Sequence, residues 1–279
     1  MWLKTKVLGL AAGVFAFASV SIQAAPHEIL WGIDYGSGAD TLFSIFADNP
    51  ANMTNVHALV DTGGAAVSAR GLDYWNGQLF VLGVGGRLYT INTGNGVCTL
   101  VGVAASLSGN YFGMDNTPNG VVVAGYPSPY QLTTISRTTG QVLTNGIVSV
   151  AGVTGLAYGN NGTLYAINSV AGQLGSLDPN TGVYTAIGAL GIAGSRNNGF
   201  DISPFTGTAY LGTPAASGDP QANLYTVNLA TGATTLVGLI GLPGDNILLH
   251  GLTVPEPSTI ALLGLGGFGL LVFAWRRRK

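Results

Sequence analysis

Three aspartates stand at equivalent positions of a repeated pattern and offer the first candidate chemistry in this chain. A glycine, an apolar residue and a third residue recur together, and the third residue is Asp73, Asp115 and Asp201 in three copies. Ala157 and Thr253 take that position in two others. Brought together, the three carboxylates would hold a hard cation such as Ca²⁺, or a polar ligand. On the alternative interpretation, each carboxylate accepts hydrogen bonds from backbone N–H groups of the adjoining turn.

Catalytic and metal-binding motifs are weak elsewhere in the sequence. The histidines His27, His57 and His250 are scattered and lack the close spacing of a zinc site. There is no Gly-x-Ser-x-Gly elbow, and no spacing singles out a pair of carboxylates for glycoside hydrolysis. Cys98, the single cysteine, excludes an internal disulfide and is expected to be a small buried hydrophobic residue. These patterns predict a protein that is not an enzyme and has no cofactor.

Aromatic residues on expected loops form a further candidate binding surface. Tyr and Trp rings beside Asn, Thr and Ser are typical of surfaces that bind carbohydrate or protein. The segment Tyr126–Tyr130 carries two such rings on one proline-stiffened loop. Packing between elements is the alternative role for each ring. The aromatic residues concerned are Trp31, Tyr35, Tyr74, Trp75, Tyr111, Tyr126 and Tyr130.

Charge is sparse and acidic between the two apolar ends of the chain. Residues 26–254 contain four arginines, no lysine, one glutamate and ten aspartates, a formal net charge of −7. The whole-chain value of −2 hides this imbalance because the other cations lie near the termini. A segment so poor in cations lacks the electrostatic footprint of a nucleic-acid-binding protein, so nucleic acid is not expected as a partner.

The elements that position the aspartates follow from an internal repeat of about 42 residues. The glycines that open each copy are 42, 42, 44 and 52 residues apart: Gly71, Gly113, Gly155, Gly199 and Gly251. Each of the first four copies contains four short strand-like segments. In the first copy these segments are Gly71–Tyr74, Gln78–Leu82, Arg87–Ile91 and Gly96–Val101. Four short strands in a unit of this length are the signature of a β-propeller blade.

A second repeated feature is the turn before the fourth strand. It begins with Asp, Asn or Ser and ends in Thr-Gly, as in Asp178–Gly182 and Asn228–Gly232. The polar side chain caps the turn, and glycine takes the positive φ that closes the hairpin. The threonines of these turns are therefore interpreted as structural.

The ends of the repeat region indicate how the propeller closes. Ile29–Ile33 matches the second strand of a blade, Thr41–Ile45 matches the third, and Gly251–Val254 matches the first. The C-terminal strand would thus complete the N-terminal blade and remove exposed sheet edges. The sequence predicts an all-β, five-bladed β-propeller over residues 26–254. One extra hairpin within Asp48–Ala69 and an open β-sandwich or solenoid stay as alternatives.

The N-terminus has the organisation of a secretory signal peptide. Lys4 and Lys6 form a basic region, Val7–Val20 is apolar, and small residues suited to cleavage follow at Ala24 and Ala25. Residues 1–25 are therefore expected to be removed on export through the inner membrane.

The C-terminus combines a polar motif, an apolar run and a basic end. Pro255 and Pro257 favour an extended, readable segment, and the 17 uncharged residues Thr259–Trp275 would rise about 25 Å as a transmembrane helix. The motif residues are Val254, Pro255, Glu256 and Pro257. The cations expected to hold the end on the cytoplasmic side are Arg276, Arg277, Arg278 and Lys279. Residues 254–279 resemble the PEP-CTERM sorting signal of Gram-negative bacteria, and 255–279 form the expected sorting segment.

The resemblance implies processing by an exosortase-type enzyme, transient membrane attachment, and an association with exopolysaccharide. The expected protein is a non-enzymatic interaction or structural protein of the cell envelope, cell surface or extracellular matrix. The main alternative is an extracellular propeller hydrolase or lyase that acts on glycan. A coat protein without a defined ligand is a third interpretation.

Overall fold

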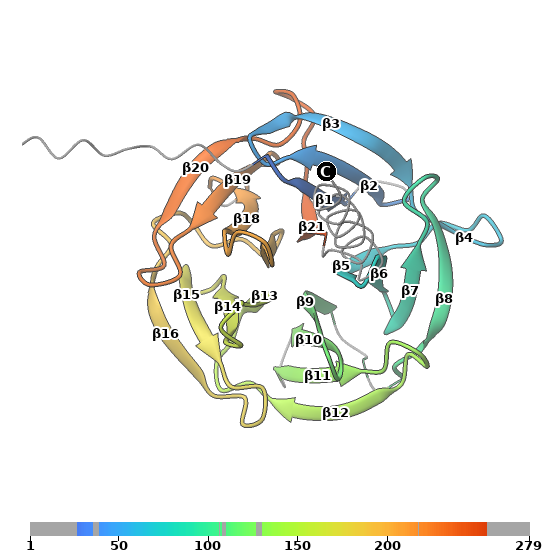
Figure 1. Cartoon of the computed structure of the whole chain (residues 1–279), viewed down its shortest axis with the longest axis horizontal. Coiled ribbons are helices and arrows are strands. Elements are labelled where there is room, and N and C mark those ends of the chain that lie inside the picture. The colour runs from blue at the N-terminus through green and yellow to red at the C-terminus, as the bar shows by residue number, and fades with distance from the viewer. Residues whose placement is uncertain are drawn as a thin grey trace, which may run out of the picture.

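The protein is a five-bladed β-propeller (Figure 1). The computed structural model describes residues 27–35, 39–105, 107, 110–126, 130–216 and 218–255, and every helix or strand element in these ranges is a strand. The five sheets stand around a central axis, and the first strand of each blade lies nearest to that axis (Figure 1). The predicted fold class and blade count are confirmed.

Each blade is built from four antiparallel strands that follow one another from the axis outward. Blade 1 comprises β21 (Leu249–Thr253), β1 (Ile29–Asp34), β2 (Thr41–Phe46) and β3 (Asn49–Ala58). Blade 2 comprises β5 (Ala69–Trp75), β6 (Gln78–Gly83), β7 (Arg87–Ile91) and β8 (Val97–Val103). Blade 3 comprises β9 (Asn110–Thr117), β10 (Gly120–Tyr126), β11 (Gln131–Ile135) and β12 (Val142–Ile147). Blade 4 comprises β13 (Val153–Tyr158), β14 (Leu164–Asn168), β15 (Gln173–Leu177) and β16 (Tyr184–Ala189). Blade 5 comprises β17 (Gly199–Ile202), β18 (Ala209–Pro214), β19 (Ala222–Val227) and β20 (Thr234–Leu239).

The two ends of the propeller domain meet in blade 1. Strand β21 pairs antiparallel with β1, with Trp31 opposite Thr253, so the expected closure by the C-terminal strand is confirmed. The stretch Asp48–Ala69 holds β3 and a two-residue strand, β4 (Val60–Asp61), after which the chain turns back so that Val60 forms an antiparallel bridge with Ala66; this small hairpin adds no blade. Strand β4 lies parallel to the edge strand β8 and covers part of that edge.

The repeated hairpin turns have the predicted capping. The side chain of Asp178 accepts a hydrogen bond from the backbone N–H of Asn180 at 2.8 Å, and Asn228 does the same for Ala230 at 2.9 Å. Gly182 and Gly232 close these turns at φ values of 70° and 79°. A side chain at either glycine would meet backbone of the preceding blade, so the turn also fixes the contact between blades.

The repeated glycine of the innermost strand is required by close packing at the axis. A Cβ atom on Gly199 would lie 2.2 Å from the backbone nitrogen of Leu252, and one on Gly251 would lie 2.6 Å from Cβ of Leu72. The other three glycines of the set meet the next blade in the same way. Five strands can therefore converge only where this position has no side chain. At this level the channel is reduced to a cavity of about 10 Å³.

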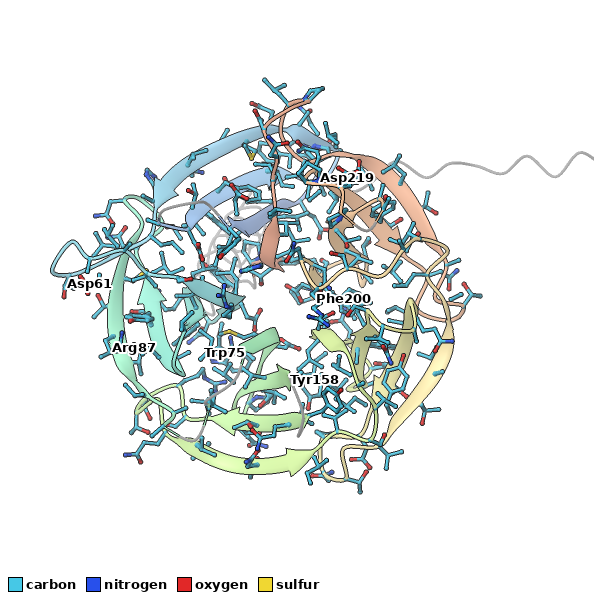
Figure 2. The ribbon with its side chains drawn as sticks, turned by 180° about the vertical axis from the view of Figure 1, so that it is seen from behind. Asp61, Trp75, Arg87, Tyr158, Phe200 and Asp219 are labelled. Carbon is cyan, nitrogen blue, oxygen red and sulfur yellow. The ribbon has the colours of Figure 1, made fainter. Side chains whose placement is uncertain are left out.

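Apolar side chains fill the space between neighbouring blades. Five buried clusters occur, one at each blade-to-blade interface, and Phe200 lies near the axis (Figure 2). Cys98 is fully buried in the cluster between blades 1 and 2, which confirms the prediction of a small hydrophobic residue there. Burial raises the pKa of its thiol to about 12, so the sulfur stays protonated at neutral pH.

Candidate functional site at the channel mouth

The three predicted aspartates come together at the end of the channel where the innermost strands end. Asp73, Asp115 and Asp201 lie on β5, β9 and β17, and one carboxylate oxygen from each lies within 4.8 Å of the others. All three side chains are buried. We refer to these residues as the aspartate ring. A cation or a cationic group of a ligand would find three oxygen donors here, so the site prediction stays open for test.

Each aspartate also connects its blade to the next one. The carboxylate of Asp73 accepts hydrogen bonds from the backbone N–H and from the side-chain amide of Asn116. Asp115 accepts the backbone N–H of Tyr158, and Asp201 accepts that of Val254. In each case the donor is the residue that comes directly after the equivalent ring position in the sequence of the neighbouring blade. Backbone N–H bonding is therefore present, but most donors come from the next blade and not from the adjoining turn.

The two positions without aspartate behave differently. Thr253 Oγ1 lies 2.9 Å from Asp73 Oδ1 and 2.9 Å from Asp201 Oδ2, so its hydroxyl links the carboxylates on either side. Ala157 offers no acceptor, and the N–H of Ile202 donates instead to Asp201 of its own blade at 2.6 Å. The ring is thus continuous through Thr253 and interrupted at Ala157.

Burial and mutual repulsion oppose the ionisation of the aspartate ring. Burial is the largest cause and raises the pKa of all three carboxyl groups. Negative charge on Asp73 and Asp201 raises the pKa of Asp115 further, well above its ordinary value. The interaction between the neighbouring carboxyl groups of Asp73 and Asp115 lowers the pKa of Asp73, against the larger effect of burial, and raises the pKa of Asp115, as expected when two such groups share a proton.

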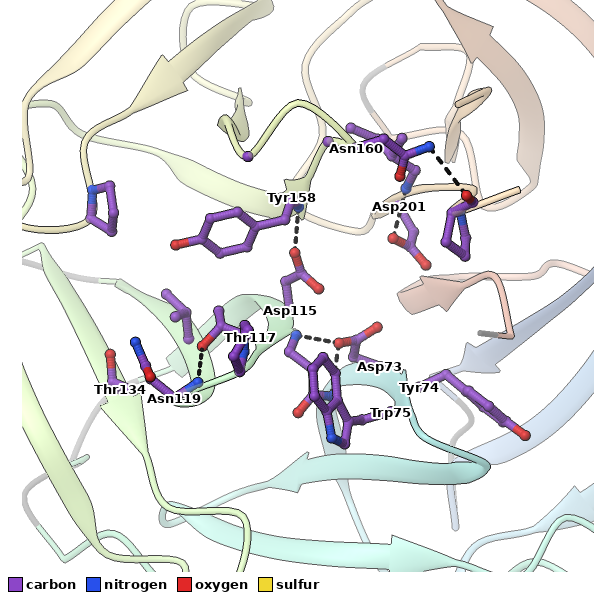
Figure 3. A pocket seen from close by; sticks show the side chains of 18 of the residues that line it. Asp73, Tyr74, Trp75, Asp115, Thr117, Asn119, Thr134, Tyr158, Asn160 and Asp201 are labelled. Atoms are coloured by element: carbon purple, nitrogen blue, oxygen red, sulfur yellow. Dashed lines mark hydrogen bonds between the residues drawn. The ribbon is translucent and has the colours of Figure 1, made fainter. Parts of the chain in front are cut away.

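A cavity of about 750 Å³ opens above the aspartate ring, and we call it the mouth cavity. Figure 3 shows Trp75 and Tyr158 beside the three carboxylates, and Tyr74, which also lines the cavity, with its ring pointing away from them. Asparagine and threonine side chains supply further hydrogen-bonding groups, and among the described residues that line it there is no lysine, arginine or histidine. The guanidinium of Arg137 lies over the Trp75 ring at 4.3 Å and donates to the carbonyl of Gly120, which braces the rim. The polar lining residues include Asn116 and Thr117 at the end of β9, and Asn119, Asn160 and Asn180 in turns.

Comparison with protein families identifies the body of the chain. A family model described as "Domain of unknown function (DUF4394)" matches residues 41–252, which is most of the chain. The chain belongs to the DUF4394 family. A second model, the PEP-CTERM protein-sorting motif, matches residues 253–279 and confirms the resemblance seen in the sequence. This motif marks an exported protein that an exosortase-type enzyme sorts to the cell envelope or surface of a Gram-negative bacterium.

Comparison with solved structures finds other proteins of similar shape. A protein of unknown function from Bacteroides caccae has a TM-score of 0.48 at 9% identity, over 83% of this chain and 100% of that chain. Glutaminyl cyclase from Myxococcus xanthus has a TM-score of 0.46 at 17% identity, over 66% and 85%. The calcium-binding protein regucalcin from Agrobacterium tumefaciens has 0.44 at 16%, over 80% and 78%. None of these similarities indicates a function for this chain. No curated protein matches the sequence.

The sorting motif begins directly at the mouth cavity of the DUF4394 domain. Val254 is buried, lines the cavity and donates its N–H to Asp201, and Pro255 is the last described residue. The predicted signal peptide, the rest of the sorting motif, the transmembrane helix and the basic end lie outside the described residues. Within the described part of the chain, no helix has the length and apolar character needed to cross a membrane.

The three histidines lie apart from the mouth cavity. His27 pairs with Asp48 at 2.9 Å near the start of the domain, and His57 lies on the outermost strand β3. His250 lies at the opposite end of the channel, where its ring stacks on Tyr35 at 4.5 Å and accepts a hydrogen bond from Arg70 at 3.1 Å. Burial lowers the pKa of His250 to about 4, so it is neutral at physiological pH.

The predicted aromatic residues divide between the two ends. Trp31, Tyr74 and Trp75 lie on the side of the mouth cavity, whereas Tyr35 lies at the opposite end. Tyr130 packs against the core between blades 3 and 4, and the side chains of Tyr111 and Tyr126 are outside the described part. The sequence analysis missed Tyr158, although its place directly after a ring position is a signal that would have found it.

Proposed function

We propose that this exported propeller binds extracellular glycan in its mouth cavity, without chemical turnover, at the cell surface or in the matrix. The observation that carries the proposal is the lining of the mouth cavity. The rings of Tyr74, Trp75 and Tyr158 offer apolar faces, and neighbouring amide and hydroxyl groups offer hydrogen bonds. Sugars present the same combination of apolar ring faces and polar edges. The cavity volume of about 750 Å³ is within the range of sites that hold small ligands.

The state of the aspartate ring supports binding over hydrolysis. Glycoside hydrolysis needs an ionised carboxylate and a separate carboxylic acid on two sides of the scissile bond. In this ring carboxylate oxygens of Asp115 and Asp73 lie within 4.8 Å of each other, and both groups accept backbone N–H bonds from neighbouring blades. Such groups are held in place by the fold and are suited to fixing a ligand. The alternative of a glycan hydrolase or lyase makes a different prediction in the same experiment.

The experiment uses protein collected from the surface and the matrix of its producing cells. Neutral, amino and acidic oligosaccharides are titrated by calorimetry, and the mixtures are then analysed by mass spectrometry. Saturable binding with unchanged oligosaccharides supports the proposal. New reducing ends or unsaturated products establish the enzymatic alternative, and no binding to any oligosaccharide refutes the glycan ligand.

The same samples report on sorting. Proteolytic peptide analysis is expected to find a C-terminus at or near Pro257 in the surface fraction. A surface fraction that ends uniformly at Lys279 would mean a membrane-anchored protein and would remove the matrix location.

A further inference from the structure

Three hollows on the face that bears the aspartate ring share their lining residues. The mouth cavity shares Tyr74 with a hollow of about 420 Å³ over blade 2, the blade-2 hollow. On its other side it shares Gly162 and Pro179 with a hollow of about 460 Å³ over blade 4, the blade-4 hollow. The two flanking hollows therefore adjoin the mouth cavity over blades 2 and 4. We refer to the three adjoining hollows together as the groove.

We infer that the ligand of this groove is a linear glycan chain that occupies several consecutive subsites. The inference rests on the proposed glycan-binding function and extends it from a single sugar site to a polymer site. A small ligand would be held by the mouth cavity alone, which already has the volume of a small-molecule site. A chain that extends beyond the centre on both sides would also contact the residues of the two flanking hollows.

The flanking hollows share the polar lining of the centre, and the blade-2 hollow, like the centre, also has aromatic residues. In the blade-2 hollow, Trp31 and Tyr74 lie beside Gln78, Thr90 and Thr99. In the blade-4 hollow, Pro179 lies beside Ser176 and three threonines. The blade-2 hollow therefore combines aromatic ring faces with hydroxyl and amide groups, and the blade-4 hollow combines a proline ring with hydroxyl groups. The polar residues that line the blade-4 hollow include Thr163, Ser176, Thr181 and Thr185.

Charge selects among glycans. The aspartate ring forms an acidic floor at the middle of the groove, and no basic residue is present among the described residues that line any of the three hollows. The guanidinium of Arg137 at the rim is stacked on Trp75 and donates to the backbone carbonyls of Gly120 and Pro118. A chain of uronic acids would place like charge above this floor, where repulsion opposes binding. A neutral or amino-sugar polymer meets no such repulsion. We therefore assign the groove to a neutral or partly amino-substituted linear glycan.

The repeat supplies matched positions for a test. Thr99, Thr185 and Thr235 occupy the same register in blades 2, 4 and 5, opposite Thr90, Ser176 and Thr226 of the adjoining strand. All three are exposed, so an arginine side chain is tolerated by the fold. Thr99 lines the blade-2 hollow and Thr185 lines the blade-4 hollow, whereas Thr235 lines none of the three. The variants Thr99→Arg and Thr185→Arg block the groove, and Thr235→Arg adds the same charge elsewhere.

The experiment measures Kd for a series from disaccharide to octasaccharide of the neutral or amino-sugar glycan that binds in the calorimetric screen. We expect affinity to rise with length until the groove is filled. Thr99→Arg and Thr185→Arg should each weaken binding of the longest oligosaccharide by about tenfold, the loss expected for one or two hydrogen bonds. They should leave disaccharide binding unchanged, and Thr235→Arg should leave all values unchanged.

Two contrary results are distinguishable. If all lengths bind equally and the blocking variants have no effect, glycan binding stands but the polymer groove is wrong. If no length of any oligosaccharide binds while the variants unfold normally, the proposed function itself fails and the inference fails with it.

Discussion

Replacing Asp115 by asparagine should make the folded protein more stable at neutral pH. The asparagine side chain keeps an oxygen that can accept the N–H of Tyr158, so the connection between blades 3 and 4 survives. It removes a negative charge from a buried cluster in which the carboxylate oxygens lie within 4.8 Å of one another. At that separation and an effective dielectric constant of about 20, two charges repel by roughly 3.5 kcal/mol. We expect a gain of roughly 2–4 kcal/mol where the wild-type cluster is ionised.

The sign of the pH dependence follows from the raised pKa of Asp115. A group with a higher pKa in the folded state binds protons more tightly there than in the unfolded chain. Its contribution to stability is complete below the unfolded pKa of about 4 and is lost as pH rises through the folded pKa. The asparagine variant has no such loss. The advantage of Asp115→Asn should therefore be absent near pH 4 and should grow by about 1.4 kcal/mol per pH unit until it levels off.

Thermal and urea unfolding between pH 4 and pH 8, with a chelator present, measure this difference. A gain of 2–4 kcal/mol corresponds to a rise in Tm of roughly 5–15 °C for a domain of this size. Asp61→Asn is the control, because it removes one charge from a loop at the rim, where Asp61 accepts N–H bonds from Gly63 and Ala65 at 2.8 and 2.9 Å. Asp61 and the rim position of its loop are visible in Figure 2. Equal destabilisation of Asp115→Asn at pH 4 and pH 8 would refute the electrostatic argument.

Three further results are expected. If the aspartate ring holds a cation, calcium should raise the Tm of the wild-type protein and leave the Tm of Asp115→Asn unchanged. A wild-type Tm that stays constant over a wide range of calcium concentration would refute the cation site. Gly199→Ala should lower the urea midpoint by an amount equivalent to about 1–3 kcal/mol or more, because the new Cβ atom would collide with Leu252. Gly146→Ala is the control and should be neutral, because the nearest atom to its Cβ would lie 3.8 Å away. Glu28→Ala should lower the free energy of unfolding by about 1–3 kcal/mol, because Glu28 accepts hydrogen bonds from Tyr210 at 2.7 Å and Ser203 at 2.5 Å in blade 5. An unchanged urea midpoint would show that these bonds do not stabilise the start of the domain.

The fold could be predicted because one periodic pattern determines it. Turn residues such as Asp178 and Gly182 act within a single hairpin, and their spacing alone gives the strand count of each blade. The position of the aspartate ring follows from the same periodicity, since equivalent residues of the innermost strands must surround the axis. The extra strand β4 was not predictable, because a two-residue strand has no periodicity of its own.

The contacts between blades could not be read from the sequence. Asp201 bonds to Val254, 53 residues away, and Glu28 bonds to Tyr210, 182 residues away. Such pairs depend on the angle and height at which the blades meet, and those are set by the packing of apolar clusters and not by local propensity. The groove was hidden for the same reason, since its lining threonines resemble the other threonines of the outer strands until the hollows are located.

The aspartate ring is an argument for a ligand because its structural task does not require charge. An asparagine at each ring position would accept the same N–H bonds and would avoid both the burial of a carboxylate and its repulsion by the others. Thr253 shows that a neutral side chain can link the ring, and Ala157 shows that one position can lack an acceptor altogether. The three carboxylates therefore cost stability that the fold does not need to lose. Their place on the floor of the mouth cavity gives that cost a functional explanation, since a bound cationic or hydrogen-bonding group would offset it.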